Sequence, residues 1–223
     1  DVRDGAVGTG DPDRDTAVLA YFGDGASSQG DVNEAFVFAG AGNLPVVFFC
    51  QNNQWAISEP VTTQSRVPLY KRASGFGFPG MRIDGNDVLA SLAVTRKALN
   101  DARNAQGPTL IEAFTYRMNP HTTNDDTRRY RLGSEAETWK LKDPIARVKA
   151  YLLREANVGT EFFAELEQES KKLAEHVRAG CRALPNPTPE SVFQNVYVDV
   201  PDELLKQRGE FVDFVSSIEE VNA

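Results

Sequence analysis

Cysteine and histidine are scarce in this 223-residue chain, and positive charge is in deficit. The chain contains two cysteines and two histidines, and 24 lysines and arginines are outnumbered by 32 aspartates and glutamates, for a net charge of −8. Cys50 and Cys181 are far apart and form no CxxC motif, which argues against a disulfide scaffold or a zinc site and fits a reducing compartment. The acidic balance argues against nucleic-acid binding.

Long apolar runs are missing as well, although the composition supports a sizeable core. No apolar run approaches the ~20 residues of a membrane span, and no signal or transit peptide is visible. We therefore expect no membrane association and a cytoplasmic location. The hydrophobic content of 41% and charged content of 25% are typical of a globular protein.

The chain opens on Asp1 with a polar, glycine-rich stretch, DVRDGAVGTGDPDRD, which runs straight into a buried-strand pattern. We expect this stretch to be a loop. We also expect the chain to begin inside a larger fold, so that an upstream part of any site is missing.

Short apolar segments alternate with helical patterns over the first half of the chain. Strands are predicted at 17–22, 45–50, 81–84 and 109–116, and helices at 31–42, with Gly42 as its C-cap, and at 87–104. This alternation predicts an α/β fold with a mostly parallel sheet that helices cover on both faces. Ligands of such sheets bind beyond the carboxyl ends of the strands.

The second half of the chain is predicted to be helical. Successive segments predict a long loop at 117–137, a helix opened by Asp143-Pro144, a charged helix from about 160 to 183, a proline-rich linker at 183–190 and an amphipathic helix at 202–218. We therefore predict two domains, an α/β cofactor-binding domain at 1–136 and a helical C-terminal region at 137–223.

Polar residues follow two of the predicted strands and indicate a metal site. Asp24 lies in the FGDGASSQGD stretch after the first strand, and Asn53 follows the second strand 29 positions later. With the helix at 31–42 as the crossover, both oxygen donors converge on one edge of the sheet. A carboxylate, an amide oxygen and a backbone carbonyl suit Mg²⁺ with a diphosphate, whereas Ca²⁺ requires more carboxylates and zinc prefers His or Cys.

The spacing of these motifs resembles that of a known family. GDG, 26 intervening residues and then NN is similar to the thiamine-diphosphate signature. The stretches YFGDGASSQGDVNEAFVFAG and LPVVFFCQNNQWAIS resemble the α subunit of 2-oxo acid dehydrogenases, the decarboxylating first component of those complexes. The resemblance runs from about residue 16 to the C-terminus, and it implies the thiamine-diphosphate-binding fold with thiamine diphosphate and Mg²⁺ as cofactors.

The resemblance also implies roles for individual residues. It assigns metal ligands to the side chains of Asp24 and Asn53 and to the backbone carbonyl of Trp55. Cofactor contacts are implied at four further positions: Gly25, Ala26, Gln51 and Ile57. Gln51 stands where some relatives have arginine, and Ile57 stands where an apolar residue packs on the pyrimidine end of the cofactor. Core packing is the alternative for Trp55 and Ile57.

One of the two histidines is a candidate for catalysis. His121 lies in YRMNPHTTNDDTRRYR, just past the fourth strand at the same edge of the sheet, whereas His176 lies on a charged helix and is expected at the surface. Imidazole exchanges protons near neutral pH, and the resemblance places His121 at the reactive end of the cofactor, aiding acyl transfer to a lipoyl group. The resemblance also implies that Arg117 points at the phosphates of the cofactor. Thr122 replaces the regulatory phosphoserine of mitochondrial relatives.

The resemblance implies partners that supply what this chain lacks. The glutamate that engages the aminopyrimidine ring comes from the β subunit in the family, so we expect the chain to be inactive alone. The family assembly has two α and two β subunits on a lipoyl-bearing acyltransferase core. The helix at 202–218 fits either a subunit interface or core packing.

The sequence is compatible with three functions. The leading hypothesis is oxidative decarboxylation of branched-chain 2-oxo acids, because the tail PNPTPESVFQNVYVDVPDELLKQ and the MRIDGNDVLA stretch resemble the branched-chain enzymes more than the pyruvate enzymes. Pyruvate dehydrogenase is the alternative substrate class. A non-catalytic thiamine-diphosphate-binding scaffold is the alternative of another class. A nucleotide-binding sheet would require a GxGxxG or GxxxxGK[ST] loop, and the sequence contains neither.

Overall fold

The computed structural model describes residues 7–221, with side chains described for residues 7–218. The predicted loop at 1–15 forms turns without helix or strand from Val7 onward, and its first six residues lie outside the described part. Contacts group Asp1–Val158 and Gly159–Ala223 into two compact units, and the domain boundary predicted after residue 136 stays a prediction. Among the described helices, none has the length and apolar character needed to cross a bilayer.

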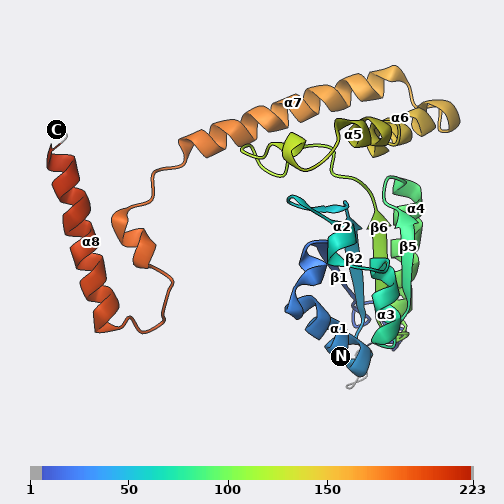
Figure 1. Ribbon diagram of the computed structural model, residues 1–223, viewed down its shortest axis with the longest axis horizontal. Helices are drawn as coiled ribbons and strands as arrows, with labels where there is room; N and C mark the ends of the chain where they lie inside the picture. The colour runs from blue at the N-terminus through green and yellow to red at the C-terminus, as the bar shows by residue number, and fades with distance from the viewer. Residues whose placement is uncertain (1–6, 222–223) are drawn as a thin grey trace. The chain divides into compact units, whose positions relative to one another are not determined.

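The first unit is built on a four-stranded sheet with the strand order β1-β2-β6-β5 (Figure 1). The strands are β1 (Val18–Gly23), β2 (Val46–Asn52), β5 (Gly80–Asp84) and β6 (Thr109–Phe114). All of its strand pairs are parallel, so the predicted α/β class is confirmed. Strand β2 runs beyond the predicted end at residue 50, because Gln51 pairs with β1 and Asn52 pairs with β6.

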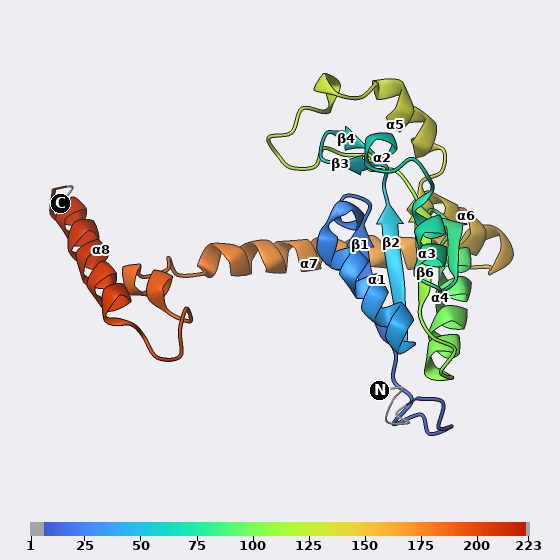
Figure 2. The same ribbon diagram turned by 60° about the horizontal axis from the view of Figure 1, so that its bottom comes forward.

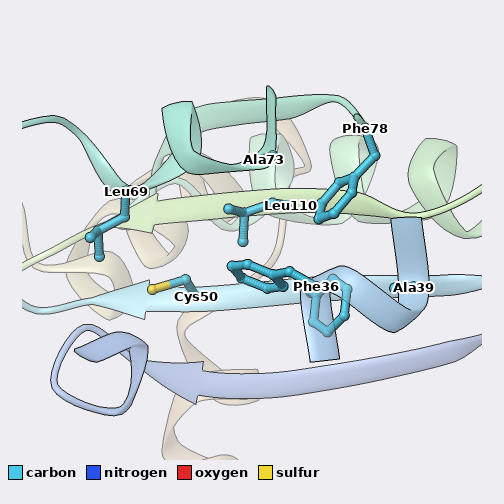
Figure 3. Close-up of a cluster of buried hydrophobic side chains, with 8 residues drawn as sticks. Phe36, Ala39, Cys50, Leu69, Ala73, Phe78 and Leu110 are labelled. Atoms are coloured by element: carbon cyan, nitrogen blue, oxygen red, sulfur yellow. The ribbon is translucent and has the colours of Figure 1, made fainter. Parts of the chain in front are cut away.

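One face of the sheet is covered by α1 (Gly30–Gly42), η3 (Leu69–Lys71) and α3 (Arg72–Gly75). Phe36 of α1 is 1% exposed and lies among aromatic rings, with centroids 4.8 Å from Phe48 and 5.7 Å from Phe78 (Figure 3). Burying a side chain of this size stabilises a fold by about 1.5–3 kcal/mol. Helix α1 ends at Gly42 as predicted, but the left-handed cap residue is Asn43, at φ 47°, and not a glycine. Asparagine tolerates this conformation because its short amide bonds locally.

The other face of the sheet is covered by α4 (Val88–Arg103), and Figure 2 shows α1 and α4 on opposite sides of β2. Val47 and Ile111 of the central strands pack on Ala98 and Ala102, and these small side chains let the helix approach the sheet closely. The carboxylate of Asp87 caps the helix by accepting a hydrogen bond from the Ala90 N–H at 2.9 Å. The predicted helix at 87–104 is therefore confirmed, as is coverage of both faces.

The connections of the first unit contain short elements that the sequence pattern did not predict. A hairpin of β3 (Trp55–Ala56) and β4 (Glu59–Pro60) is followed by α2 (Val61–Gln64). The loop predicted at 117–137 contains η4 (Thr127–Arg129), and α5 (Gly133–Lys140) begins inside it, so the last part of that prediction is wrong. The Trp139 ring stacks on the Tyr116 ring, with centroids 5.6 Å apart. This tertiary contact stabilises α5, and the polar sequence of the segment gives no sign of it.

The remaining helices follow the predictions closely. Helix α6 (Pro144–Glu155) opens with Asp143, whose carboxylate accepts a hydrogen bond from the Ala146 N–H at 2.8 Å. In the second unit, α7 (Thr160–Ala183) is followed by the short η5 (Pro189–Phe193) and by α8 (Asp202–Val221). Phe193 contacts Phe211 of α8 with ring centroids 5.8 Å apart, so η5 covers part of the apolar face of that helix.

Candidate functional site

The carboxyl ends of β1 and β2 bring Asp24 and Asn53 together. The two strands pair in parallel with Gly23 opposite Gln51, so the residues that follow them leave the sheet at the same edge. The backbone N–H of Asn53 donates a hydrogen bond to Oδ1 of Asp24 at 3.2 Å. The expectation that both residues meet at one sheet edge is confirmed.

Asp24 is a buried carboxylate, only 1% exposed. Its two hydrogen bonds come from neutral donors, the Asn53 N–H and, at 3.1 Å, Nε2 of Gln64 in α2. Burying an ionised carboxylate is costly unless it is compensated by opposite charge. A divalent cation would supply that charge, so the donor set of Asp24 fits the predicted metal.

Amide side chains at the end of β2 and in the turn that follows it hold this turn in place. Oδ1 of Asn52 accepts a hydrogen bond from the Gln54 N–H at 2.9 Å, and Oδ1 of Asn53 accepts one from the Trp55 N–H at 3.1 Å. Nε2 of Gln54 donates to the Thr115 carbonyl at 2.7 Å, while Gln54 itself adopts φ 72°. The side chains thus stabilise a turn with one left-handed residue, and this turn sets the positions of Asn53 and Trp55.

The GDG turn packs against the β3-β4 hairpin. A Cβ atom at Gly25 would lie 2.8 Å from the Cβ of Ala56, so the close approach of the two segments requires glycine at this position. Ala26 begins the short η2 (Ala26–Ser28), and Ser27 Oγ donates to the Asp24 carbonyl at 2.6 Å. Gly25 and Ala26 therefore lie beside Asp24 on a turn held from both sides.

Trp55 and Ile57 differ in exposure, although both were candidates for core packing. Trp55 is buried, with its ring 5.4 Å from the Tyr130 ring. Ile57 is 56% exposed and adopts φ 55°, which is unusual for a β-branched residue. Core packing accounts for Trp55 but not for Ile57. The predicted cofactor contact Gln51 is also exposed, at the end of β2.

Arg117 links the loop after β6 to the hairpin. Its guanidinium donates to the carbonyls of Trp55 and Ile57 at 3.1 and 2.6 Å, and to the hydroxyl of Tyr130 at 2.9 Å. The Nε–H of Arg117 is buried and has no acceptor among the described residues. An unsatisfied buried donor is costly, and an anionic oxygen at this edge of the sheet would satisfy it, which fits a phosphate.

His121 is exposed, and its backbone N–H is tied to this network. Its N–H donates to Oδ2 of Asp125 at 2.8 Å, and the same oxygen accepts a hydrogen bond from the Tyr130 hydroxyl at 2.6 Å. These two hydrogen bonds, the one from Tyr130 first, hold the pKa of Asp125 below its usual 3.8. Through Asp125, the loop that carries His121 is joined to Tyr130 and Arg117.

Residue patterns did not reveal several partners that shape the site. Glu112 of β6 is fully buried and accepts a hydrogen bond from Nδ2 of Asn52 at 2.7 Å. Its signal is a charged residue inside the apolar run TLIEAF. Gln64 and Tyr130 lie in polar segments where nothing separates them from ordinary surface residues.

The carboxyl edge of the parallel sheet carries a buried aspartate, an asparagine turn and an unsatisfied arginine N–H. These features are typical of the α/β proteins that bind phosphorylated cofactors at strand ends. The chain belongs to the dehydrogenase E1 component family, whose sequence profile matches residues 4–190. This family consists of thiamine-diphosphate-dependent oxidoreductases of the 2-oxo acid dehydrogenases.

Individual relatives are similar over most of the chain. It is 45% identical over 201 residues to the 3-methyl-2-oxobutanoate dehydrogenase subunit alpha of Mycobacterium tuberculosis, covering 88% of this chain and 54% of that protein. It is 37% identical to the human mitochondrial 2-oxoisovalerate dehydrogenase subunit alpha, and the match covers 86% of this chain and 43% of that protein. It is 38% identical to the pyruvate dehydrogenase E1 component subunit alpha of Acholeplasma laidlawii, and the match covers 88% of this chain and 58% of that protein. The chain thus spans about half the length of these relatives.

Proposed function

We propose that this chain is the cofactor-binding part of the α subunit of a branched-chain 2-oxo acid dehydrogenase that acts on 3-methyl-2-oxobutanoate. The observation that carries the proposal is the 45% identity to the mycobacterial 3-methyl-2-oxobutanoate dehydrogenase α subunit over 88% of the chain. The reaction releases the carboxyl group as CO₂, reduces a lipoyl disulfide and leaves the acyl group on one of its two sulfurs.

The site residues are assigned to the cofactors that this reaction uses. Thiamine diphosphate, when bound, supplies the carbon that adds to the 2-oxo carbonyl and takes up the electron pair left by CO₂. Asp24, Asn53 and the Trp55 carbonyl would hold Mg²⁺, which favours oxygen donors and phosphate. Arg117 would direct its Nε–H at the diphosphate, and Ile57 would offer its exposed apolar side chain to the pyrimidine ring. Gly25, Ala26 and Gln51 would contact the cofactor from the ends of the two strands.

His121 is assigned the proton transfer near the acyl group. Its side chain is exposed on a loop whose backbone is held by Asp125, so the imidazole is free to meet a lipoyl arm that enters from solution. An imidazole N–H would donate a hydrogen bond to the oxygen of the acyl group, and its proton would pass to the lipoyl sulfur that is released as the disulfide opens and the other sulfur takes the acyl group. A β subunit, in an assembly of two α and two β chains, would supply the carboxylate that engages the aminopyrimidine ring, and a lipoyl-bearing acyltransferase core would accept the acyl group.

Steady-state kinetics with the full-length α subunit and its β subunit test the proposal. We expect decarboxylation that needs thiamine diphosphate, Mg²⁺ and both subunits, with a higher kcat/KM for 3-methyl-2-oxobutanoate than for pyruvate. A preference for pyruvate would favour the alternative that the Acholeplasma relative supports. Cofactor binding without turnover of either 2-oxo acid would favour a non-catalytic scaffold.

The role of His121 is tested separately with His121→Ala. We expect thiamine diphosphate to bind with near-normal affinity, because the hydrogen bond that His121 gives to the loop network comes from its backbone N–H, which alanine keeps. Acyl transfer to lipoamide should fall by about 100-fold or more, the range typical of a lost acid or base. Unchanged transfer would remove His121 from the mechanism.

A further inference from the structure

We propose that Glu112 is a positioning residue, which orients the Asn52 carboxamide and through it fixes the turn that carries Asn53 and the Trp55 carbonyl. The inference rests on the proposed function, because its consequence is the affinity of the site for Mg²⁺ in the presence of thiamine diphosphate. In the described part of the chain, the hydrogen bonds of the Glu112 side chain go to Asn52, Tyr70 and Arg82 and not to Asp24, Asn53 or Trp55, so Glu112 acts through Asn52.

Glu112 occupies a place in the sheet where an apolar side chain would be expected. It lies opposite Cys50 of β2 and opposite Arg82 of β5, on the face that carries Leu110. Its side chain is 0% exposed. A carboxylate in this position lowers the stability of a fold unless it is fully paired, so the groups around it must be held where they can donate to it.

All the recorded partners of Glu112 are donors. Oε1 accepts hydrogen bonds from Nδ2 of Asn52 and from the Arg82 guanidinium, each at 2.7 Å. Oε2 accepts one from the backbone N–H of Tyr70 at 3.0 Å. Arg82 supplies the opposite charge and also lies over the Phe114 ring at 4.5 Å. The carboxylate is thus held by three different elements, β2, β5 and η3, and cannot rotate without losing one of them.

This arrangement decides which way the Asn52 carboxamide points. Its NH₂ group must face the carboxylate of Glu112, so its oxygen faces the Gln54 N–H, from which it accepts a hydrogen bond at 2.9 Å. If the carboxamide flipped, its NH₂ group would face another donor, and the left-handed turn at Gln54 would lose its side-chain support. Groups that hydrogen-bond a metal ligand directly typically change metal affinity by about 10- to 100-fold when removed. Glu112 acts one residue further out, through Asn52 and the turn, so an effect near the lower end of that range is expected.

The test is Glu112→Gln in the full-length α subunit assembled with its β subunit. Glutamine keeps the shape but offers one oxygen and one NH₂ group, so it cannot accept from both Asn52 and Tyr70. At a fixed thiamine diphosphate concentration, we expect the Mg²⁺ concentration for half-maximal cofactor binding, followed by tryptophan fluorescence, to rise by about 10-fold. An unchanged Mg²⁺ requirement would overturn the inference.

Asp15→Asn is the matched control, because Asp15 is also a buried carboxylate of the first unit, at 7% exposed, but accepts its hydrogen bonds from Thr9 and Gly10 ahead of β1. Both variants are expected to lower the melting temperature, and only Glu112→Gln should raise the Mg²⁺ requirement. An equal rise in both would mean that general destabilisation is the cause, and would overturn the proposal.

Asn52→Ala provides a second route to the same answer, including the case in which Glu112→Gln does not fold. It leaves the bonds of Glu112 to Tyr70 and Arg82 in place and should raise the Mg²⁺ requirement to a similar extent. The double variant should be no worse than Asn52→Ala alone, since Glu112 acts through Asn52. Additive effects, or a normal Mg²⁺ requirement in Asn52→Ala, would contradict the proposal. Wild-type protein without Mg²⁺-dependent binding would instead overturn the proposed function, and this inference with it.

Discussion

Strand β1 has a buried aspartate at each end, and the two are held in opposite ways. Asp15, ahead of the strand, accepts hydrogen bonds from the N–H groups of Thr9 and Gly10 at 2.9 and 2.8 Å, and these residues are six and five positions away. Asp24, after the strand, is bonded by Asn53 and Gln64, which are 29 and 40 positions away. The hydrogen bonds of Asp15 therefore lie within its own loop, whereas those of Asp24 form only when the sheet has folded.

The difference indicates which end of the sheet carries function. The bonds of Asp15 lie within one loop and account for its burial. Asp24 shares its edge with Arg117, whose buried Nε–H has no acceptor among the described residues, and with the exposed apolar Ile57. The polar groups around Asp15 are satisfied, whereas the edge that carries Asp24 has a buried donor without an acceptor. Such an unsatisfied group is typical of a ligand site.

The strongest test of this contrast replaces each aspartate by asparagine. Asp24→Asn keeps the shape and removes the charge that the metal needs, so the affinity for thiamine diphosphate in the presence of Mg²⁺ should fall by about 100-fold or more. Asp15→Asn should leave that affinity unchanged. Calorimetric titration of the full-length subunit with its β subunit measures both. Retained Mg²⁺-dependent affinity in Asp24→Asn would refute the metal assignment.

A second test compares two glycines of the GDG turn. Gly25→Ala places a Cβ atom 2.8 Å from that of Ala56, whereas a Cβ at Gly23 meets nothing within 4 Å. We expect Gly25→Ala to lower the free energy of unfolding by about 1–3 kcal/mol through overpacking, and Gly23→Ala to change it by less than ~0.5 kcal/mol. Urea denaturation without cofactor gives both values.

A double variant tests whether the contact between Gly25 and Ala56 causes the loss of stability. If the clash with Ala56 is the cause, the double variant Gly25→Ala, Ala56→Gly should recover most of the lost stability. Gly25 has φ −60°, a conformation that alanine adopts freely, so failure to recover would mean that the contact with Ala56 is not the cause of the lost stability.

The smallest expected effect concerns pH and the loop ahead of β1. Hydrogen bonds from Thr9, its backbone N–H first, lower the pKa of Asp15 from its usual 3.8. Because the folded-state pKa is the lower one, the stabilisation is complete above the usual value and disappears as pH falls through the lowered value. The difference in unfolding free energy between wild type and Asp15→Asn should therefore be present at about pH 7 and shrink below about pH 3.8. A difference that stays constant would show that Asp15 stabilises through shape alone.

The sequence predicted those features whose causes are local. The helix at 87–104 and the one opened by Asp143-Pro144 follow from caps and apolar periodicity within the same segments, and both are present as α4 and α6. Asp24 and Asn53 could be placed at one edge because parallel strands joined by a helical crossover end on the same side. The helix α5 was missed, since Trp139 gains its support from Tyr116, which lies well ahead of it in the chain.

The amino-acid sequence alone determined the class of fold and which strand ends carry polar residues, because hydrophobic periodicity and crossover geometry are set by neighbouring residues. Only the tertiary structure decided how those residues are held. Glu112 reaches Asn52 over 60 positions, and Arg117 reaches the Trp55 carbonyl over 62. No local pattern encodes such pairs, because hydrogen bonds between distant segments exist only after the sheet has brought them within reach.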